Sequence, residues 1–273
     1  SGDSTAQDSV PEEPLDETGG FQLVFQTRYL LWIAMMILVT NVVNTTGEYI
    51  LANAAKTYAE ETIPTLSDDQ KASAMAHVEM EARGEDGFEL ADALADAEER
   101  ALRSARSEVI GAFYGNFFFW VNIVAVVFQA FLVSRLVKYL GLAGVLFALP
   151  LTSFAAYGII AVGVTSLGLV RWLKTAENST DYSVMNTARQ LLWLPTTREE
   201  KYKAKQAVDS FFVRLGDLVS AVVVFVGTTW LALQTQGFAL LNVGVVLVWI
   251  ALAVVLVREN RRLSAKQDES KAA

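Results

Sequence analysis

Charged side chains interrupt the second half of an otherwise apolar sequence, and they recur at helical spacing. Placed on a helix, Arg171, Lys174, Asn178 and Asp181 follow steps of three or four residues and form one stripe. Glu177 lies beside Lys174 and four residues before Asp181. Ionisable groups at membrane depth are costly, face a bundle interior or a water-filled cavity, and commonly mark a solute pathway. We therefore expect these five residues to contact an anionic solute.

A second polar set begins the next apolar segment. Ser210, Arg214 and Asp217 share a helical face, and Arg214 and Asp217 are close enough to pair. If the two stripes face each other, they form a hydrated cavity in which cations hold an anion and carboxylates balance the charge. The alternative is an internal salt-bridge network that locks two helices together, and the sequence leaves both interpretations open.

Glu48 is a further candidate in the first apolar segment. Asn41, Asn44 and Glu48 are spaced by three and four residues and would share one helical face. One interpretation is a carboxylate that faces the lumen of the bundle. The other is an interfacial acid at a helix end.

Long apolar segments must position these side chains. Each is about 20 residues long, which is enough to cross a bilayer, and uninterrupted apolar runs favour helices over barrel strands. The sequence predicts an all-α, multi-pass membrane protein with six transmembrane helices. The third and fourth segments are nearly continuous, so five is the alternative count. The six segments are 29–54, 113–137, 142–162, 164–184, 208–234 and 239–257.

The hydrophilic segments have distinct compositions. Residues 1–20 have almost no large apolar groups and are expected to be a disordered cytoplasmic linker. Residues 56–108 carry fourteen acids and six bases at an amphipathic helical period, which predicts a helical, non-cytoplasmic insert. Ser67 and Gln70 form a possible capping box, and Gly84 and Gly87 would divide the insert into two helices. A solvated hairpin over the mouth of the bundle is expected, and the alternative is a docking element for a partner.

The short connections predict the topology. Basic residues follow the second span, cluster between 189 and 205, and recur in the tail at 260–273. The alternate connections near Gly163 and at 234–237 carry no base. By the positive-inside rule, both chain ends and the basic connections face the cytoplasm.

Other classes of function have little support. The chain has no cysteine, and its one histidine, His77, has no partner at ligand spacing. No nucleophile–base arrangement, phosphate loop or metal cluster is present. We therefore expect no enzyme activity, no metal or cofactor, and no nucleic-acid partner.

Several motifs resemble those of a known family. The sequences AENSTDYS, NTARQ, LPTTREEKYKAKQAVD and FFVRLGD are similar to the nucleotide (ATP/ADP) transporter family of plastids and obligate intracellular bacteria, and most to its broad bacterial relatives. That family resembles the major facilitator superfamily, whose twelve helices form two six-helix halves. The similarity covers residues 21–259 and resembles the carboxy-terminal half. It implies a preceding six-helix half, in the same chain or as a separate subunit, and a bacterial inner membrane location.

The resemblance also bears on individual residues. Glu48 is the nearest match to an important carboxylate in the first helix of this half of the exchangers. Asp217 stands where the exchangers have a lysine, which reverses the local charge and argues against strict ATP/ADP exchange. It leaves Arg214 or Lys174 as candidate phosphate partners.

The leading prediction is the carboxy-terminal half of a secondary transporter that binds and moves ATP, ADP or a related anionic metabolite by alternating access. One alternative keeps the fold but makes Asp217 or Glu48 a proton-coupling carboxylate for another solute. A second alternative is a non-transporting membrane subunit that docks a partner through its acidic insert.

Overall fold

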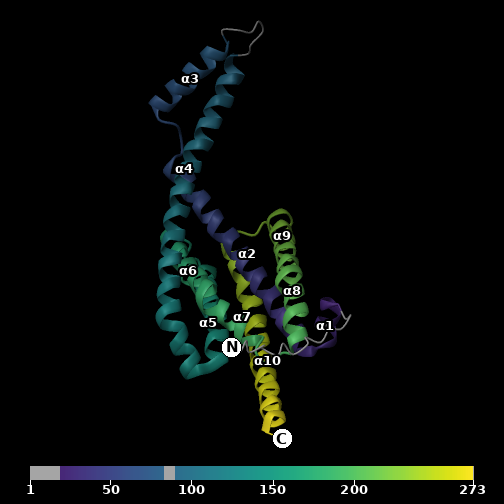
Figure 1. The fold of residues 1–273 in the computed structure, drawn as a ribbon. Coiled ribbons are helices and arrows are strands. Elements are labelled where there is room, and N and C mark those ends of the chain that lie inside the picture. The colour runs from purple at the N-terminus through teal and green to yellow at the C-terminus, as the bar shows by residue number, and fades with distance from the viewer. Residues whose placement is uncertain (1–18, 83–89, 273) are drawn as a thin grey trace, which may run out of the picture.

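All regular structure in the described residues is helical (Figure 1). The structure is a computed structural model, and it describes residues 19–82 and 90–272. Four helical stretches are long and apolar enough to cross a membrane, and they span Arg28–Thr62, Asp92–Ala161, Glu200–Thr229 and Thr235–Gln267. The prediction of an all-α, multi-pass membrane protein is confirmed at this level. Most of the predicted linker at 1–20, together with Gly84 and Gly87, lies outside the described residues.

Helix α2 (Arg28–Thr62) is the centre of the bundle. At 35 residues it is about 50 Å long. Its apolar window is 61% buried, whereas the windows of the other three stretches are 22–28% buried. It contacts α4, α6, α9 and α10, whose bounds are given below. The other long helices therefore surround α2 and turn much of their apolar surface outward, as lipid-facing helices do.

The stretch Asp92–Ala161 contains two of the predicted spans, 113–137 and 142–162. It comprises α4 (Leu90–Val127), a π-helical segment η1 (Phe128–Leu132) and α5 (Val133–Ala161). Gly141 has φ +61° and ψ −148°, where the helical conformation is interrupted. Glycine adopts this backbone conformation readily because it has no Cβ. The chain therefore bends between the two predicted spans without leaving a long loop.

The predicted fourth span at 164–184 is helical but is not one of the four apolar stretches. It comprises α6 (Leu167–Thr180) and η2 (Asp181–Met185) and continues into α7 (Asn186–Leu192). The polar side chains that marked it in the sequence lower its hydropathy. Helix α6 nevertheless packs against α2, α4 and α5, so it belongs to the bundle.

The last two predicted spans lie in long helical stretches. The first is built from η3 (Glu200–Ala204), α8 (Lys205–Ala207), η4 (Val208–Phe212) and α9 (Val213–Thr229). The second is α10 (Thr235–Ala272), which packs against α5 and α2. π-Helical turns are rare and occur frequently at functional sites. Two of them, η3 and η4, fall at the start of the α9 stretch.

The acidic insert is continuous with the membrane helices at both ends. Helix α2 extends to Thr62, α3 covers Asp68–Ala82, and α4 runs from Leu90 directly into the next span. Figure 1 shows α3 and the first part of α4 projecting together beyond the bundle. The Ser67 backbone N–H donates to Gln70 Oε1 at 3.0 Å, and the Gln70 N–H donates to Ser67 Oγ at 3.4 Å. The predicted capping box is thus present at the start of α3.

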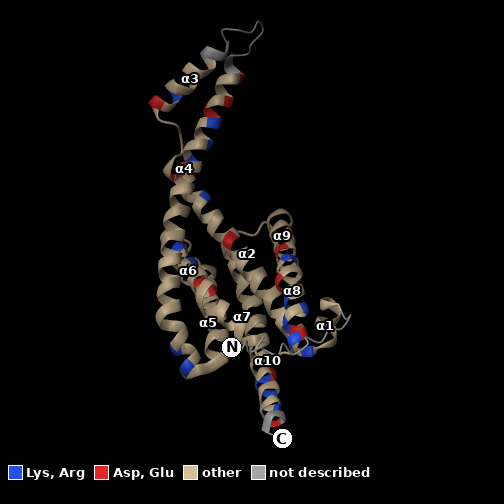
Figure 2. Ribbon diagram, in the orientation of Figure 1, with Lys and Arg blue, Asp and Glu red and all other residues tan. Residues whose placement is uncertain are grey.

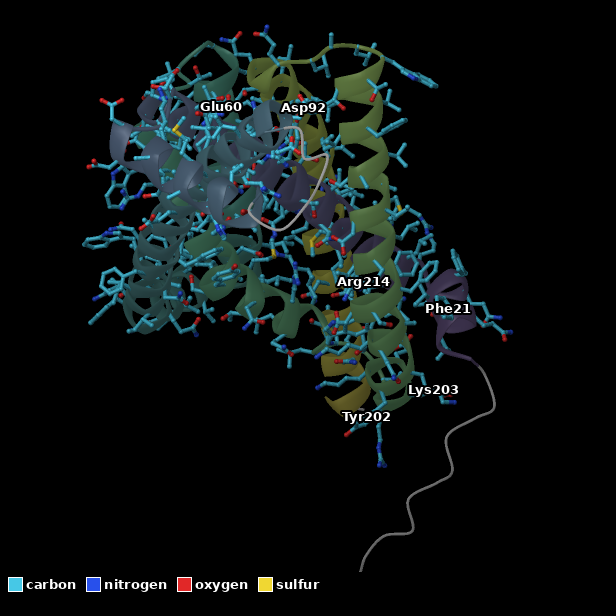
Figure 3. The ribbon with its side chains drawn as sticks, turned by 90° about the horizontal axis from the view of Figure 1, so that it is seen from above. Phe21, Glu60, Asp92, Tyr202, Lys203 and Arg214 are labelled. Atoms are coloured by element: carbon cyan, nitrogen blue, oxygen red, sulfur yellow. The ribbon has the colours of Figure 1, made fainter. Side chains whose placement is uncertain are left out.

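The short helix α1 (Gly20–Gln26) lies against the start of the α9 stretch. Its Phe21 ring contacts Phe211 edge-on at 5.1 Å between ring centroids, and Phe25 lies 6.4 Å from Phe212. Phe21 and Phe25 are also exposed on their outer side. Figure 3, which labels Phe21, shows this helix at the periphery of the bundle. Such exposed aromatic residues suit a membrane interface.

Close packing of α9 on α2 makes a specific prediction for Gly216. A Cβ added there would lie 2.8 Å from Asn41 Cβ and 3.0 Å from the Leu38 carbonyl oxygen. We expect Gly216→Ala to lower the free energy of unfolding by about 1–3 kcal/mol, because the two helices must move apart. The measurement is thermal unfolding of the full-length protein in detergent, followed by tryptophan fluorescence.

Gly244→Ala is the matched control, because a Cβ added on α10 at that position meets nothing within 4 Å. The control should be as stable as the parent protein or slightly more stable, since alanine favours helix. Equal stability of the two variants would contradict the close α2–α9 packing.

Candidate functional site

Lys174 lies at the centre of a buried polar cluster. Its side chain is 0% exposed, and its Nζ lies 2.7 Å from Glu177 Oε2 and 3.4 Å from Glu48 Oε1. Lys174 and Glu177 are three residues apart on α6 and therefore adjacent on the helix surface. Glu48 reaches them from α2, which packs against α6. The cluster thus places one ammonium between two carboxylates from different helices.

Helix α5 completes the surroundings of Glu177. Tyr157 Oη donates to Glu177 at 2.8 Å, and Ser153 Oγ donates to Glu177 Oε1 at 2.9 Å. Both side chains are fully buried. A buried carboxylate is tolerated when it is paired and its remaining lone pairs accept hydrogen bonds, and both conditions hold here. The cluster therefore joins α2, α5 and α6 through one set of polar contacts.

Gly47 allows the three helices to approach this closely. A Cβ at this position would overlap Tyr157 Oη and would lie 2.8 Å from Lys174 Nζ. Sequence reasoning did not select Gly47, Ser153 or Tyr157. A signal was available for two of them, because Ser153 and Tyr157 are polar, four residues apart and set in an apolar helix.

Glu48 forms the accessible edge of the cluster. Its side chain is 37% exposed, and it accepts a hydrogen bond from Asn178 Nδ2 at 2.9 Å. Asn178 is itself buried, and its Oδ1 has no hydrogen-bond partner among the described residues. Four of the eight predicted site residues therefore meet at one place, namely Glu48, Lys174, Glu177 and Asn178.

Two other predicted residues lie on the same helical stretch but outside the cluster. Arg171 Nη2 donates to Asn116 Oδ1 on α4, while its Nε is buried and has no partner among the described residues. Asp181 lies 3.9 Å from Arg189, and both line a pocket of about 410 Å³ with Tyr182 and Asn186. The π-helical segment η2 begins at Asp181 and changes the register of the predicted stripe there.

Arg214 and Asp217 form a second, more exposed polar group. Arg214 Nη1 lies 3.4 Å from Asp217 Oδ2, as the spacing predicted, and the Arg214 side chain is 85% exposed. Figure 3 labels Arg214 on α9. Asp217 Oδ1 accepts hydrogen bonds from Asn41 Nδ2 at 2.6 Å and Thr45 Oγ1 at 3.2 Å, both on α2.

We expected the two polar stripes to face each other, but in the structure each of them contacts α2 instead. The hydrogen bonds and ion pairs described above link each stripe to α2, which lies against both α6 and α9. One face of α2 contacts both groups, through residues that follow steps of four and three. Asn41 and Thr45 contact Asp217, and Glu48 contacts Lys174. Thr45 takes the place that we predicted for Asn44. The polar face of α2 is therefore the element that connects the two groups.

The described residues offer no metal site. Among residues 19–82 and 90–272, no three His, Cys, Asp or Glu side chains are placed to hold a metal ion. The polar clusters combine cations, carboxylates and amides, so they can offer both hydrogen-bond donors and acceptors to a polar solute.

An apolar helical bundle with ion pairs in its interior is typical of a multi-pass membrane protein, in which such groups commonly mark a solute pathway. Residues 106–260 match the protein family described as TLC ATP/ADP transporter. Because this match covers more than half of the 273 residues, the chain belongs to that family. It is a family of transporters and not of enzymes, as the sequence predicted.

Curated relatives carry the same family resemblance. The chain is 26% identical over 185 residues to "ADP,ATP carrier protein 1" of Chlamydia trachomatis serovar D, covering 59% of this chain and 35% of that protein. It is 26% identical over 168 residues to the protein of the same name in Chlamydia pneumoniae, covering 53% of this chain and 32% of the relative. The matched region thus spans about a third of the length of these relatives. No solved structure matches the chain.

The burial of Lys174 predicts an asymmetric stability effect. Removing the ammonium alone, in Lys174→Met, leaves the Glu177 carboxylate buried without its counter-charge and should cost about 3–5 kcal/mol. Adding Glu177→Gln removes that charge and keeps a side-chain oxygen that can accept from Ser153 and Tyr157. The double variant should therefore recover most of the loss in thermal unfolding of the full-length protein.

Arg214→Met is the control for this experiment, since it breaks a surface pair and should cost about 1 kcal/mol or less. A double variant as unstable as Lys174→Met would show that the loss comes from packing rather than from an unbalanced charge.

Proposed function

We propose that this chain is part of a secondary transporter that moves ATP, ADP or a related phosphate-bearing metabolite. The observation that carries the proposal is the buried Lys174, held between Glu177 and Glu48 where α2 meets α6. Membership of the TLC ATP/ADP transporter family and the names of the chlamydial relatives support the choice of a nucleotide as the solute.

Substrate binding is proposed to exchange one anion for another at Lys174. Glu177 is fixed by Ser153 and Tyr157, so it stays with Lys174. Glu48 is half-buried, lies further from Lys174 Nζ and is held otherwise by one hydrogen bond from Asn178. A phosphate oxygen can therefore replace the Glu48 carboxylate as the second anion of Lys174. An ammonium makes charge-assisted hydrogen bonds to phosphate as well as to carboxylate, so Lys174 keeps a second anionic partner in this exchange.

The remaining predicted residues would hold other parts of the substrate. Arg171 offers a buried guanidinium nitrogen without a partner among the described residues, and Arg214 is exposed beside Asp217. Asp181, in its pocket with Arg189, would balance the charge of an arginine before the anion arrives. We assign Glu48, Arg171, Lys174, Glu177, Asn178, Asp181, Arg214 and Asp217 to the proposed substrate path.

We further propose that the membrane part has six transmembrane helices, with α6 to η2 as the fourth span. On this proposal the chain corresponds to the carboxy-terminal half of a major facilitator bundle, with both ends cytoplasmic, in a bacterial inner membrane. It would rock against a preceding six-helix half to give alternating access. Loss of the Glu48–Lys174 contact on binding would loosen α2 from α6, which links occupancy to movement.

Proton coupling is the second candidate, and the position of Glu48 favours it. The Glu48 side chain is partly exposed to solvent and contacts the buried Lys174 ammonium, so it connects the solvent with the cluster. Protonation of Glu48 would free Lys174 in the same way that a phosphate would displace Glu48. Under this mechanism uptake follows a pH gradient and does not require an internal nucleotide.

Counterflow tests the proposed function. The complete carrier, including the preceding half that we propose, is placed in liposomes loaded with unlabelled ADP, and uptake of labelled ATP is followed. We expect saturable uptake that disappears without internal ADP. Glu48→Gln should reduce the initial rate of ATP uptake by about tenfold or more, because no carboxylate is left to alternate with phosphate at Lys174. The amide oxygen can still accept the hydrogen bond from Asn178.

Lys138→Met supplies the control, since it removes an exposed lysine that lies on α5 about four turns before Ser153. Unchanged exchange in Glu48→Gln would reject the site assignment. Uptake driven by a pH gradient without internal ADP, and abolished in Glu48→Gln, would favour proton coupling. If folded protein takes up no nucleotide under either gradient, the proposed function is wrong.

A further inference from the structure

A basic pocket of about 700 Å³ lies at the start of the η3–α9 stretch, away from the Lys174 cluster. Three of the residues that line it are cations, and Asp209 is the one acid among the described lining residues. The lining consists of Thr196, Arg198, Lys201, Tyr202, Lys205, Gln206 and Asp209. Figure 2 shows several blue ribbon segments, which mark Lys and Arg, near the label of α8 and along the end of α10, with some red segments among them.

Two acids next to this pocket in sequence, Glu199 and Glu200, contact other groups, whereas Asp209 lines the pocket and interacts electrostatically with Lys205. Glu199 Oε1 accepts from Lys203 Nζ at 2.9 Å, outside the lining set. Glu200 Oε2 accepts from the Thr197 backbone N–H at 2.8 Å, and the Glu200 N–H donates to Thr197 Oγ1 at 3.3 Å. This capping box occupies the helix start. The backbone N–H groups of Thr197 and Glu200 are therefore already paired.

The two lysines of the lining, Lys201 and Lys205, can offer donors to an anion. Lys205 Nζ donates to Gln190 Oε1 at 3.1 Å, which positions it and uses one of its three N–H groups. Lys201 is exposed and makes no ion pair with any residue of the described ranges. The Arg198 guanidinium lies 6.0 Å from the centre of the Tyr202 ring, so a charged group and an aromatic face border the same space.

Tyr202 places the pocket at the edge of the apolar bundle. Its ring is 63% exposed, and the apolar Phe211 and Phe212 follow about two to three turns later and contact α1. Figure 3 labels Tyr202 and Lys203 at the periphery, in the region of Phe21. Tyrosine beside lysines at the end of a membrane span is typical of the bilayer interface, where phosphate headgroups lie.

We propose that this pocket binds a phosphate-bearing anion, with Lys201 and Lys205 as its principal contacts and Tyr202 against the adjoining part of the ligand. Two sources carry this chemistry at this position, the headgroup of an anionic phospholipid and a soluble phosphate or nucleotide. The proposal is independent of the solute that the bundle transports, because the pocket shares no residue with the Lys174 cluster.

The test measures thermal unfolding of the full-length protein in detergent at fixed ionic strength. Separate titrations use phosphatidylglycerol, phosphatidylcholine, inorganic phosphate and ADP, since a ligand that binds the folded state raises the melting temperature. We expect phosphatidylglycerol to stabilise the protein more than phosphatidylcholine. In Lys201→Ala/Lys205→Ala the midpoint of this extra stabilisation should shift to about thirtyfold higher concentration.

The control is Lys138→Ala/Arg261→Ala, which removes two exposed cations outside the pocket and the same net charge. It should titrate like the parent protein. Stabilisation by phosphate or ADP but not by phosphatidylglycerol, lost only in the pocket variant, would support a phosphate site with a soluble ligand. Equal behaviour of the pocket and control variants, or the absence of any effect of all the anionic probes, would overturn the proposal.

Discussion

The ammonium of Lys174 is enclosed by protein, and the arrangement of three helices depends on how its charge is balanced. An isolated charge in such a low-dielectric interior would cost many kcal/mol, so the carboxylate of Glu177 must lie next to it. Glu177 in turn requires donors for its other lone pairs, and Ser153 and Tyr157 supply them. One buried charge thereby fixes the register of α6 against α5 and, through Glu48, against α2.

Helix α2 makes polar contacts with helices on more than one side of the bundle. Apolar packing in a membrane distinguishes poorly between helices and lipid, so close backbone approach and polar contacts decide which helices associate. Both occur on α2. Gly47 admits Lys174 and Tyr157 on one side, and the polar residues Asn41 and Thr45 bind Asp217 on another. These contacts explain why the most polar of the long apolar helices is also the most buried.

The two anion sites that we propose differ in the cost of occupation. At Lys174 the cation is already paired, so an incoming phosphate must displace a carboxylate, and binding is tied to a change in the α2–α6 contact. At the basic pocket, Lys201 has no such partner among the described residues, and an anion can bind without separating helices. The first arrangement suits a step in transport, whereas the second suits a resident ligand that holds the start of the α9 stretch in place.

The sequence by itself determined what depends on local spacing and on composition. Apolar segments long enough to span a bilayer indicated the membrane bundle. Spacing of three residues indicated the Arg214–Asp217 pair and the Ser67–Gln70 capping box, and it placed Glu177 beside Lys174. The polar stretch around these pairs also carried the family resemblance that the comparison supports. These features can be predicted from the sequence because each of them involves a single helix.

Tertiary structure alone decided which helices bring these groups together. Glu48 meets Lys174, and Asp217 meets Asn41, because α2 passes between α6 and α9, and helical periodicity does not specify the neighbour of a helix face. Ser153 and Tyr157 looked like ordinary polar residues of an apolar helix until packing placed them on Glu177. The π-helical segment at Asp181 likewise changed the register of the predicted stripe, and a uniform 3.6-residue period cannot anticipate such a change.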